Sequence, residues 1–326
     1  MFKICVVGCG AMAKSGHGPS FKKYAQEHEN TCLAACCDVN EEAAKKFAEN
    51  FGFLRYYTDY EKMLDKENPD VVSLLVPVHL TSPMAVNIIN CGYNIILEKP
   101  PGLNRGEILA IHEAQAKAGV CVRTAFNRRY TPLVQKLKQL LEGEKIRNIT
   151  YQMYRKGRSE PDFATTAIHA IDAVSFVGGG EYEKINFNYQ EIPEAGENVA
   201  NYYLSGTLDG GVAVQIALVP MGGTISERIS VNTDRATYFV ELPFWKNCDS
   251  PGRLLRVDGA TVTHDISGDE LVDSTEMYEE SGFYEENRGF FEYLREKGEV
   301  TSDILSGIQP VEIADYLRKR KTEYKK

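Results

Sequence analysis

Short apolar runs alternate with longer segments of helix-forming composition over the first 124 residues. The apolar runs lie at residues 2–7, 31–37, 70–76, 93–97 and 120–124, and the helical segments between them include 41–50, 82–91 and 104–118. Continuous apolar runs of this length are typical of parallel strands that helices cover on both faces. Strands that alternate with helices in this way predict a right-handed, doubly wound parallel sheet.

After residue 124 the pattern changes to short segments in which apolar and polar residues alternate, most clearly between residues 202 and 240. Asp209-Gly210-Gly211 separates two of these segments and is a strong hairpin signal. Strands joined by hairpins form an antiparallel sheet, and one face of such a sheet can remain open to a partner. We therefore expect an α/β protein of two domains. Residues 1–124 form the parallel sheet, and residues 125–326 form an α/β domain with an open, largely antiparallel sheet.

Composition and charge exclude several classes of function. The net charge of −9 argues against nucleic acid as a partner, because binding to the phosphate backbone needs a basic face. The eight cysteines form no C-x-x-C pair and none stands with a histidine at zinc-ligand spacing, so we expect reduced thiols and no metal. No apolar run reaches the ~18 residues of a membrane helix, and no signal peptide precedes the first strand. These features predict a cytoplasmic protein without membrane contact.

A glycine-rich turn, Gly8-x-Gly10-x-x-Ala13, lies where the first apolar run passes into a helix. The first glycine permits a tight turn, the second lets the backbone approach a pyrophosphate, and the small third residue packs helix on strand. Backbone N–H groups at the helix start, in the stretch that includes Ala11 and Met12, would face the anion. In this strand-turn-helix context the motif predicts a dinucleotide site rather than a merely structural turn.

Asp38 follows the second apolar run and bears on the choice of cofactor. A carboxylate at this position accepts hydrogen bonds from the ribose hydroxyls of NAD and repels the 2′-phosphate of NADP. The next residues, Val39 and Asn40, supply no arginine that would offset the repulsion. We therefore expect NAD, with NADP as the less favoured cofactor.

Two further sets of polar residues are candidates for catalysis. Lys99 lies in Glu98-Lys99-Pro100 at the carboxyl end of a predicted strand, where ligands bind in open α/β sheets. Thr165, His169 and Asp172 follow an i, i+4, i+7 spacing that places them on one face of a helix. From the residues alone, this face can equally be a packed core around a hydrogen-bonded histidine or the polar face of a cleft.

Over essentially its whole length the chain resembles the glucose-fructose oxidoreductase, inositol dehydrogenase and rhizopine catabolism (Gfo/Idh/MocA) family. The matching residues are Gly8-x-Gly10-x-x-Ala13, Asp38, Glu98-Lys99-Pro100, Asn127-Arg128-Arg129-Tyr130, His169-Ala170-Ile171-Asp172 and Asn287-Arg288-Gly289-Phe290-Phe291. The resemblance implies a Rossmann domain followed by an α/β domain whose open sheet builds homodimers or homotetramers. It also implies that NAD(P) and a sugar-like alcohol meet between the domains.

The resemblance further implies roles for individual residues. His169 would be the base that takes a hydroxyl proton, with Lys99 hydrogen-bonded to the same oxygen. Asp172 would orient His169 or bind a substrate hydroxyl, and Thr165 would supply a neutral hydrogen bond. The cofactor contacts beyond the glycine-rich turn and Asp38 would come from Val76, Pro77, His79, Glu98, Lys99 and Asn127.

The chain departs from the family pattern at two places. Family dehydrogenases usually carry an aspartate where this chain has Thr165, and that aspartate holds and polarises the base. Asp162 can replace the missing carboxylate or can cap the helix. The family's Thr-Pro pair and nearby histidine are represented here by Val76-Pro77 and Thr81, with His79 close by.

These features lead to an expected NAD-dependent oxidoreductase that acts on a secondary alcohol of a carbohydrate, cyclitol or related polyol. Two alternatives stay open: an NAD-using lyase or glycosidase with a transient oxidation, and a non-catalytic sensor that binds the nucleotide. The cluster Arg155-Lys156-x-Arg158 is compatible with an anionic substrate or with a solvated basic loop.

Overall fold

The structure of the chain is a computed structural model that describes residues 1–296 and 299–326. The chain folds into two compact units. The first unit comprises residues 1–126 and 283–311, and the second comprises residues 127–282 and 312–326. The chain leaves the first unit close to the predicted boundary, but it also returns to that unit late in the sequence. Apolar periodicity reports local structure, so it does not reveal which domain a late helix joins.

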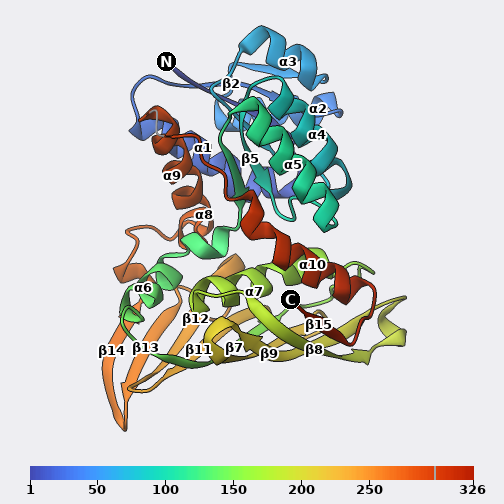
Figure 1. Cartoon of the computed structure of the whole chain (residues 1–326). Coiled ribbons are helices and arrows are strands. Elements are labelled where there is room, and N and C mark those ends of the chain that lie inside the picture. The colour runs from blue at the N-terminus through green and yellow to red at the C-terminus, as the bar shows by residue number, and fades with distance from the viewer. Residues whose placement is uncertain (297–298) are drawn as a thin grey trace. The chain divides into compact units, whose positions relative to one another are not determined.

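The first unit contains a six-stranded parallel sheet of order β3-β2-β1-β4-β5-β6. Its strands are β1 Phe2–Val7, β2 Thr31–Cys37, β3 Arg55–Tyr57, β4 Val71–Leu74, β5 Asn94–Glu98 and β6 Val122–Ala125. The helices along it, drawn in Figure 1, are α1 Gly18–Glu27, α2 Glu41–Phe51, α3 Tyr60–Glu67, α4 Val78–Asn90, α5 Arg105–Ala118 and α9 Phe283–Arg295. Because β1 is central and both of its neighbours are reached by crossovers, the predicted doubly wound sheet is confirmed.

Helix α9 joins the first unit through aromatic packing against the first strand and helix. The Phe291 ring lies 5.9 Å from that of Phe2, 5.8 Å from that of Phe21 and 5.1 Å from that of Tyr24. All four side chains are buried. Burying a large aromatic ring stabilises a fold by roughly 2–3 kcal/mol, and this accounts for the return of the chain to the first unit.

The second unit contains a nine-stranded sheet of order β14-β13-β12-β11-β7-β10-β9-β8-β15. Its strands are β7 Ile146–Tyr154, β8 Tyr182–Glu191, β9 Ala200–Leu208, β10 Val212–Val219, β11 Ser226–Thr233, β12 Thr237–Leu242, β13 Arg253–Asp258, β14 Thr261–Ser267 and β15 Glu323–Lys325. The predicted hairpin at Asp209-Gly210-Gly211 joins β9 to β10, with Leu208 opposite Val212. All pairs are antiparallel except β7 with β10, so the predicted largely antiparallel sheet is confirmed.

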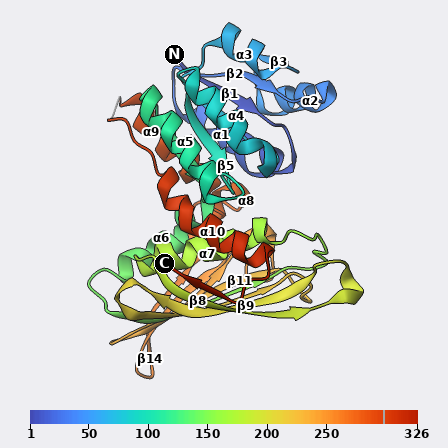
Figure 2. The same cartoon turned by 45° about the vertical axis from the view of Figure 1, so that its right-hand side comes forward.

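Helices cover one face of this sheet, as Figure 2 shows. They are α6 Pro132–Leu140, α7 Ala164–Gly178 and the part of α10 Ile308–Arg318 that belongs to the second unit, from residue 312 onward. Strand residues that face these helices, such as Tyr151, Ile229 and Tyr238, are buried. On the other face Tyr203 and Phe239 are 41% and 45% exposed, and no helix of the described chain lies over them.

Candidate functional site

The glycine-rich turn of the first unit has a conformation that depends on Gly8. This residue has φ +98°, and a Cβ added to it would stand 2.3 Å from the carbonyl oxygen of Leu75. Its N–H donates to the carbonyl oxygen of Cys37 at 2.8 Å, which holds the turn against β2. A Cβ at Gly10, in contrast, would meet nothing within 4 Å. The open space above Gly10 is what the approach of a pyrophosphate to the backbone requires.

The helix that follows the glycine-rich turn begins with a π-helical turn. Ala11 is exposed, Met12 is half-buried, and Ala13 is buried at the start of a π-helical turn, Ala13–His17, that runs directly into α1. Pro19 has no N–H to donate to a preceding carbonyl, and the N–H of Gly18 bonds to the carbonyl oxygen of Ala13 in the wider π pattern. Gly10 and Ala11 at the start of this helix are exposed, as anion binding at a helix start requires.

Asp38 lies beside the glycine-rich turn and bonds to it. One carboxylate oxygen accepts a hydrogen bond from the N–H of Cys9 at 2.8 Å, and the other accepts one from the N–H of Asn40 at 2.9 Å. Each oxygen keeps a second lone pair for a ligand donor. Val39 is 94% exposed, and the Asn40 side chain caps α2 by accepting from the N–H of Ala43.

Glu98 is buried at the end of β5 and holds the backbone of Lys99. One carboxylate oxygen lies 3.1 Å from Nε2 of His17, and the other accepts a hydrogen bond from the N–H of Lys99 at 2.9 Å. Nδ1 of His17 faces the side-chain amide of Asn287 on α9. Burial acts to raise the pKa of the Glu98 carboxyl, but the hydrogen bond and charge of His17 and the charge of Lys99 lower it overall.

Sequence reasoning missed His17, and the available signal was a histidine one helical turn beyond the glycine motif. The remaining cofactor candidates of the first unit lie where β4 passes into α4. Val76 is half-buried and Pro77 and His79 are exposed, while Thr81 is buried. All these candidates therefore follow the carboxyl ends of β1, β2, β4 and β5, at one edge of the parallel sheet. Asn127, the other cofactor candidate, belongs to the second unit.

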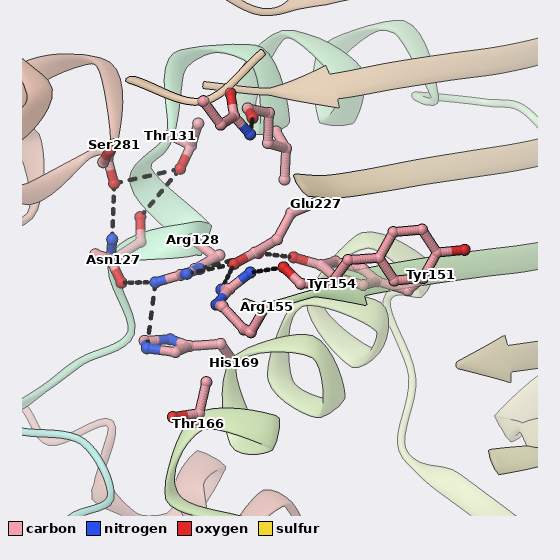
Figure 3. Close-up of polar contacts among 12 residues, drawn as sticks. Asn127, Arg128, Thr131, Tyr151, Tyr154, Arg155, Thr166, His169, Glu227 and Ser281 are labelled. Carbon is pink, nitrogen blue, oxygen red and sulfur yellow. Dashed lines mark hydrogen bonds and ion pairs between the residues drawn. The ribbon is translucent and has the colours of Figure 1, made fainter. Parts of the chain in front are cut away.

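His169 lies on α7 in the second unit and is 7% exposed. As Figure 3 shows, its Nε2 faces Arg128, which is in the 3-10 turn Asn127–Tyr130. Arg128 Nη1 donates to His169 Nε2 at 3.2 Å and to the Asn127 side-chain oxygen at 3.0 Å. The Asn127 amide in turn donates to the carbonyl oxygen of Ser281 at 2.8 Å.

Glu227 holds Arg128 from the opposite side. Its carboxylate accepts from Arg128 Nη2 at 2.6 Å, from the Tyr151 hydroxyl at 2.5 Å, and from Arg155. Glu227 is fully buried, and both arginines are 4% exposed. Burial acts to raise the pKa of the Glu227 carboxyl, but the charges and hydrogen bonds of the two arginines and Tyr151 lower it to about 2. Two fixed cations and one carboxylate give this buried cluster a net positive charge.

Asp172 also lies on α7, and its carboxylate forms a two-point ion pair with Arg129, at 2.9 and 2.5 Å. The two consecutive arginines, Arg128 and Arg129, thus bond to different acidic residues, Glu227 and Asp172. Burial raises the pKa of the Asp172 carboxyl, and Arg129 offsets only part of this effect. The role of Asp172 toward His169 stays a prediction.

Asp162 does not cap α7. The helix begins at Ala164 after an N-cap residue, Phe163, without a side-chain cap bond, and the Asp162 carboxylate accepts from Arg318 of α10 at 3.1 Å. The Thr165 hydroxyl donates to the carbonyl oxygen of Asp162 at 3.0 Å.

The sequence cluster Arg155-Lys156-x-Arg158 is not one basic patch. Arg155 is buried against Glu227, and Arg158 pairs with Glu160 and donates to the Thr166 hydroxyl. Two of its three arginine and lysine side chains are therefore paired with carboxylates of the protein. Over the described residues, no cluster of three or more histidine, cysteine or acidic side chains could hold a metal ion. In the same part of the chain, no helix combines the length and apolarity needed to cross a membrane.

Comparisons with known proteins agree with this architecture. Residues 2–126 match the family model described as the Gfo/Idh/MocA oxidoreductase family, NAD-binding Rossmann fold. An oxidoreductase called P35 from Formosa agariphila is 30% identical over 182 residues, which cover 55% of this chain and 56% of that protein. Myo-inositol 2-dehydrogenase of Thermotoga maritima is 24% identical over 194 residues, covering 56% and 57% of the two chains. The chain thus spans about half the length of the curated relatives it matches.

A solved structure of levoglucosan dehydrogenase, in complex with NADH and levoglucosan, superimposes with a TM-score of 0.83. The alignment covers 99% of both chains at 18% sequence identity, so this likeness shows the shared fold. The family match covers the sheet edge that carries the glycine-rich turn, Asp38 and Glu98-Lys99-Pro100. Residues 2–126 thus match the NAD-binding Rossmann fold of the Gfo/Idh/MocA oxidoreductase family, and the relatives that resemble the chain in sequence are named as oxidoreductases.

Proposed function

We propose that this protein is an NAD-dependent oxidoreductase that oxidises a secondary alcohol of a sugar, cyclitol or related polyol. The observation that carries the proposal is the glycine-rich turn, which bonds to Asp38 and leaves open space above Gly10. A dinucleotide pyrophosphate needs this close approach to the backbone. The family model is described as NAD-binding, and related proteins are named as inositol and levoglucosan dehydrogenases, which supports the same function.

In this proposal, bound NAD supplies the hydride acceptor. The helix start after Gly10 binds the pyrophosphate, and Asp38 accepts hydrogen bonds from the ribose hydroxyls. His169 takes the proton of the substrate hydroxyl, and Lys99 stabilises the negative charge that develops on the substrate oxygen. Thr165 and Asp172 assist on the helix of the base. The remaining proposed cofactor contacts are Ala11, Met12, Ala13, Val76, Pro77, His79, Glu98 and Asn127.

An absorbance assay separates this function from its alternatives. The protein is incubated with NAD and either levoglucosan, myo-inositol or a panel of glycosides, while NADH absorbance and product formation are followed together. Net NADH formation supports the dehydrogenase. A product that forms without net NADH points to the lyase or glycosidase with transient oxidation. NAD binding without any turnover points to the sensor.

We expect tighter binding of NAD than of NADP, because the 2′-phosphate would meet the Asp38 carboxylate. Asp38→Ser removes that charge. The ratio of the Kd for NADP to the Kd for NAD should then fall by on the order of 10-fold, the effect of one charged contact. Calorimetric titration of both proteins with both cofactors measures the effect. Glu42→Ser, on an exposed residue of α2, is the matched control and should leave the preference unchanged. Equal or tighter NADP binding by the unaltered protein would contradict the prediction.

We also expect a homodimer or homotetramer that forms through the open face of the nine-stranded sheet. Tyr203 and Phe239 are both well exposed on this face, and large exposed apolar groups on long strands are typical of surfaces that a partner covers. Light scattering at micromolar concentration should give a multiple of the 36.5 kDa chain mass. Phe239→Asp should shift the protein toward the monomer, whereas Leu54→Asp, at an exposed site of the first unit, should not. A monomer at all concentrations would rule out this assembly.

A further inference from the structure

We propose that Arg128 fixes the tautomer of His169 and is the positioning residue of the proposed base. The proposal deepens the proposed function and rests on it, since it names the residue that sets which ring nitrogen of the proposed base carries the proton. The contact that carries it is the hydrogen bond from Arg128 Nη1 to His169 Nε2, at 3.2 Å (Figure 3).

The direction of this hydrogen bond follows from the chemistry of the donor. A guanidinium has five N–H donors, no acceptor, and a charge that it keeps at any pH a protein experiences. Nε2 of His169 must therefore be the acceptor and carry no proton. The proton of the neutral imidazole is then on Nδ1, because the bond that one ring nitrogen makes decides which nitrogen is protonated.

The surroundings of Arg128 keep its guanidinium in this position. Its Nε and Nη2 both donate to the Glu227 carboxylate, at 3.3 and 2.6 Å, in a fork that limits rotation of the plane. Its Nη1 is shared between His169 and Asn127, and the Phe244 ring lies 4.0 Å from the guanidinium carbon. Glu227 is itself held by Tyr151 and Arg155, so the Arg128 donor is aimed by a chain of buried contacts.

This arrangement has a consequence for proton transfer. A proton on Nε2 would break the hydrogen bond and bring an imidazolium against a guanidinium in a buried setting. Arg128 thus favours the neutral imidazole, which is the form that a general base needs, and Nε2 becomes available only as this bond is released. The Glu227 carboxylate is bonded to Arg128 and Arg155, and the Asp172 carboxylate, on the same helix as His169, is bonded to Arg129. The Arg128 donor by itself requires an unprotonated Nε2, whatever else the ring contacts.

The test is nitrogen NMR of the imidazole rings in the full chain, without NAD or substrate. The protein is labelled with 15N-histidine, and the signal of His169 is identified among the six histidines by its loss in His169→Gln. Two-bond proton–nitrogen correlations at pH 8.5 distinguish a ring protonated on Nδ1 from one protonated on Nε2. We expect the Nδ1-protonated form for His169, at an excess of at least ~10-fold, as a charge-assisted hydrogen bond provides.

Arg128→Met removes the donor but leaves Glu227 with Arg155 and Tyr151, so the remaining cluster is charge-balanced and should fold. The ratio of the two tautomers should then fall by ~10-fold or more. Arg128→Gln, whose amide can either donate or accept, should also lower the ratio, and it measures the same ratio if the Met variant does not fold. Arg158→Met is the matched control, because Arg158 is bonded to the same helix through the Thr166 hydroxyl, and this variant should keep the wild-type ratio.

Three results would overturn the proposal: an Nε2-protonated or doubly protonated His169 in the unaltered protein, an unchanged ratio in both Arg128 variants, or an equal change in Arg158→Met. Because the measurement needs neither cofactor nor substrate, its outcome is separate from that of the proposed function. An Nδ1-protonated His169 in a protein without dehydrogenase activity would support the role of Arg128 and contradict the oxidoreductase.

Discussion

Replacing Lys99 by Met is expected to lower kcat/KM about 100-fold, because the variant loses the charge that stabilises the developing negative charge on the substrate oxygen. His169→Ala is expected to be comparably damaging, since the hydroxyl proton then has no positioned acceptor. The Kd for NAD should change little in His169→Ala and only modestly in Lys99→Met. Steady-state rates of NADH formation and calorimetric titration with NAD measure the two effects separately.

Lys117→Met is the matched control for Lys99→Met, because Lys117 is an exposed lysine in the last turn of α5. Its kcat/KM should remain that of the unaltered protein. Unchanged turnover in Lys99→Met, with the control also unchanged, would remove Lys99 from the proposed chemistry. A loss confined to NAD affinity would make it a cofactor contact alone.

Glu227→Gln is expected to lower the free energy of unfolding by roughly 3 kcal/mol, the largest stability effect of any substitution considered for this protein. The amide keeps one acceptor oxygen but turns its NH₂ group toward the donors of Arg128, Arg155 and Tyr151. Two buried guanidinium groups would then lack a counter-charge, and leaving a buried charge unpaired is strongly destabilising. Urea unfolding followed by fluorescence gives the free energy and checks that the m-value is unchanged.

The contribution of Glu227 to the free energy of unfolding should also depend on pH. Its carboxyl pKa is about 2 in the folded protein, below its ordinary value of 4.5, so the unfolded chain binds more protons between these two values. The stability from Glu227 is therefore complete above pH 4.5 and is lost as the pH falls toward 2. The difference in unfolding free energy between the unaltered protein and Glu227→Gln should shrink over this window.

Glu241→Gln provides the comparison for both measurements. Glu241 lies on β12 and pairs with Arg228 at 3.3 Å, but its side chain is 39% exposed. An exposed ion pair contributes about 0–1 kcal/mol, so this variant should be close to the unaltered protein. An equal loss of stability in Glu227→Gln and Glu241→Gln would show that the buried ion pairs of Glu227 contribute no more to the free energy of unfolding than an exposed ion pair does.

The features that the sequence predicted correctly depend on neighbouring residues along the chain. The apolar runs of β1, β2, β4 and β5 and the hairpin at residues 209–211 follow from local periodicity and turn chemistry. The positions at the carboxyl ends of these strands follow from the same pattern, because parallel strands end at a common edge. For this reason the sequence alone places the glycine-rich turn, Asp38 and Lys99 at one edge of the parallel sheet.

The sequence by itself thus determined the two sheet types, the dinucleotide motif and the edge of the parallel sheet where it lies. Only the tertiary structure decided which charged side chains meet. Glu227 bonds to Arg128, 99 residues away, and to Arg155, 72 residues away, while His17 bonds to Glu98 across 81 residues. Periodicity carries no information at such separations, whereas the desolvation of a buried charge depends entirely on which partner the fold brings to it.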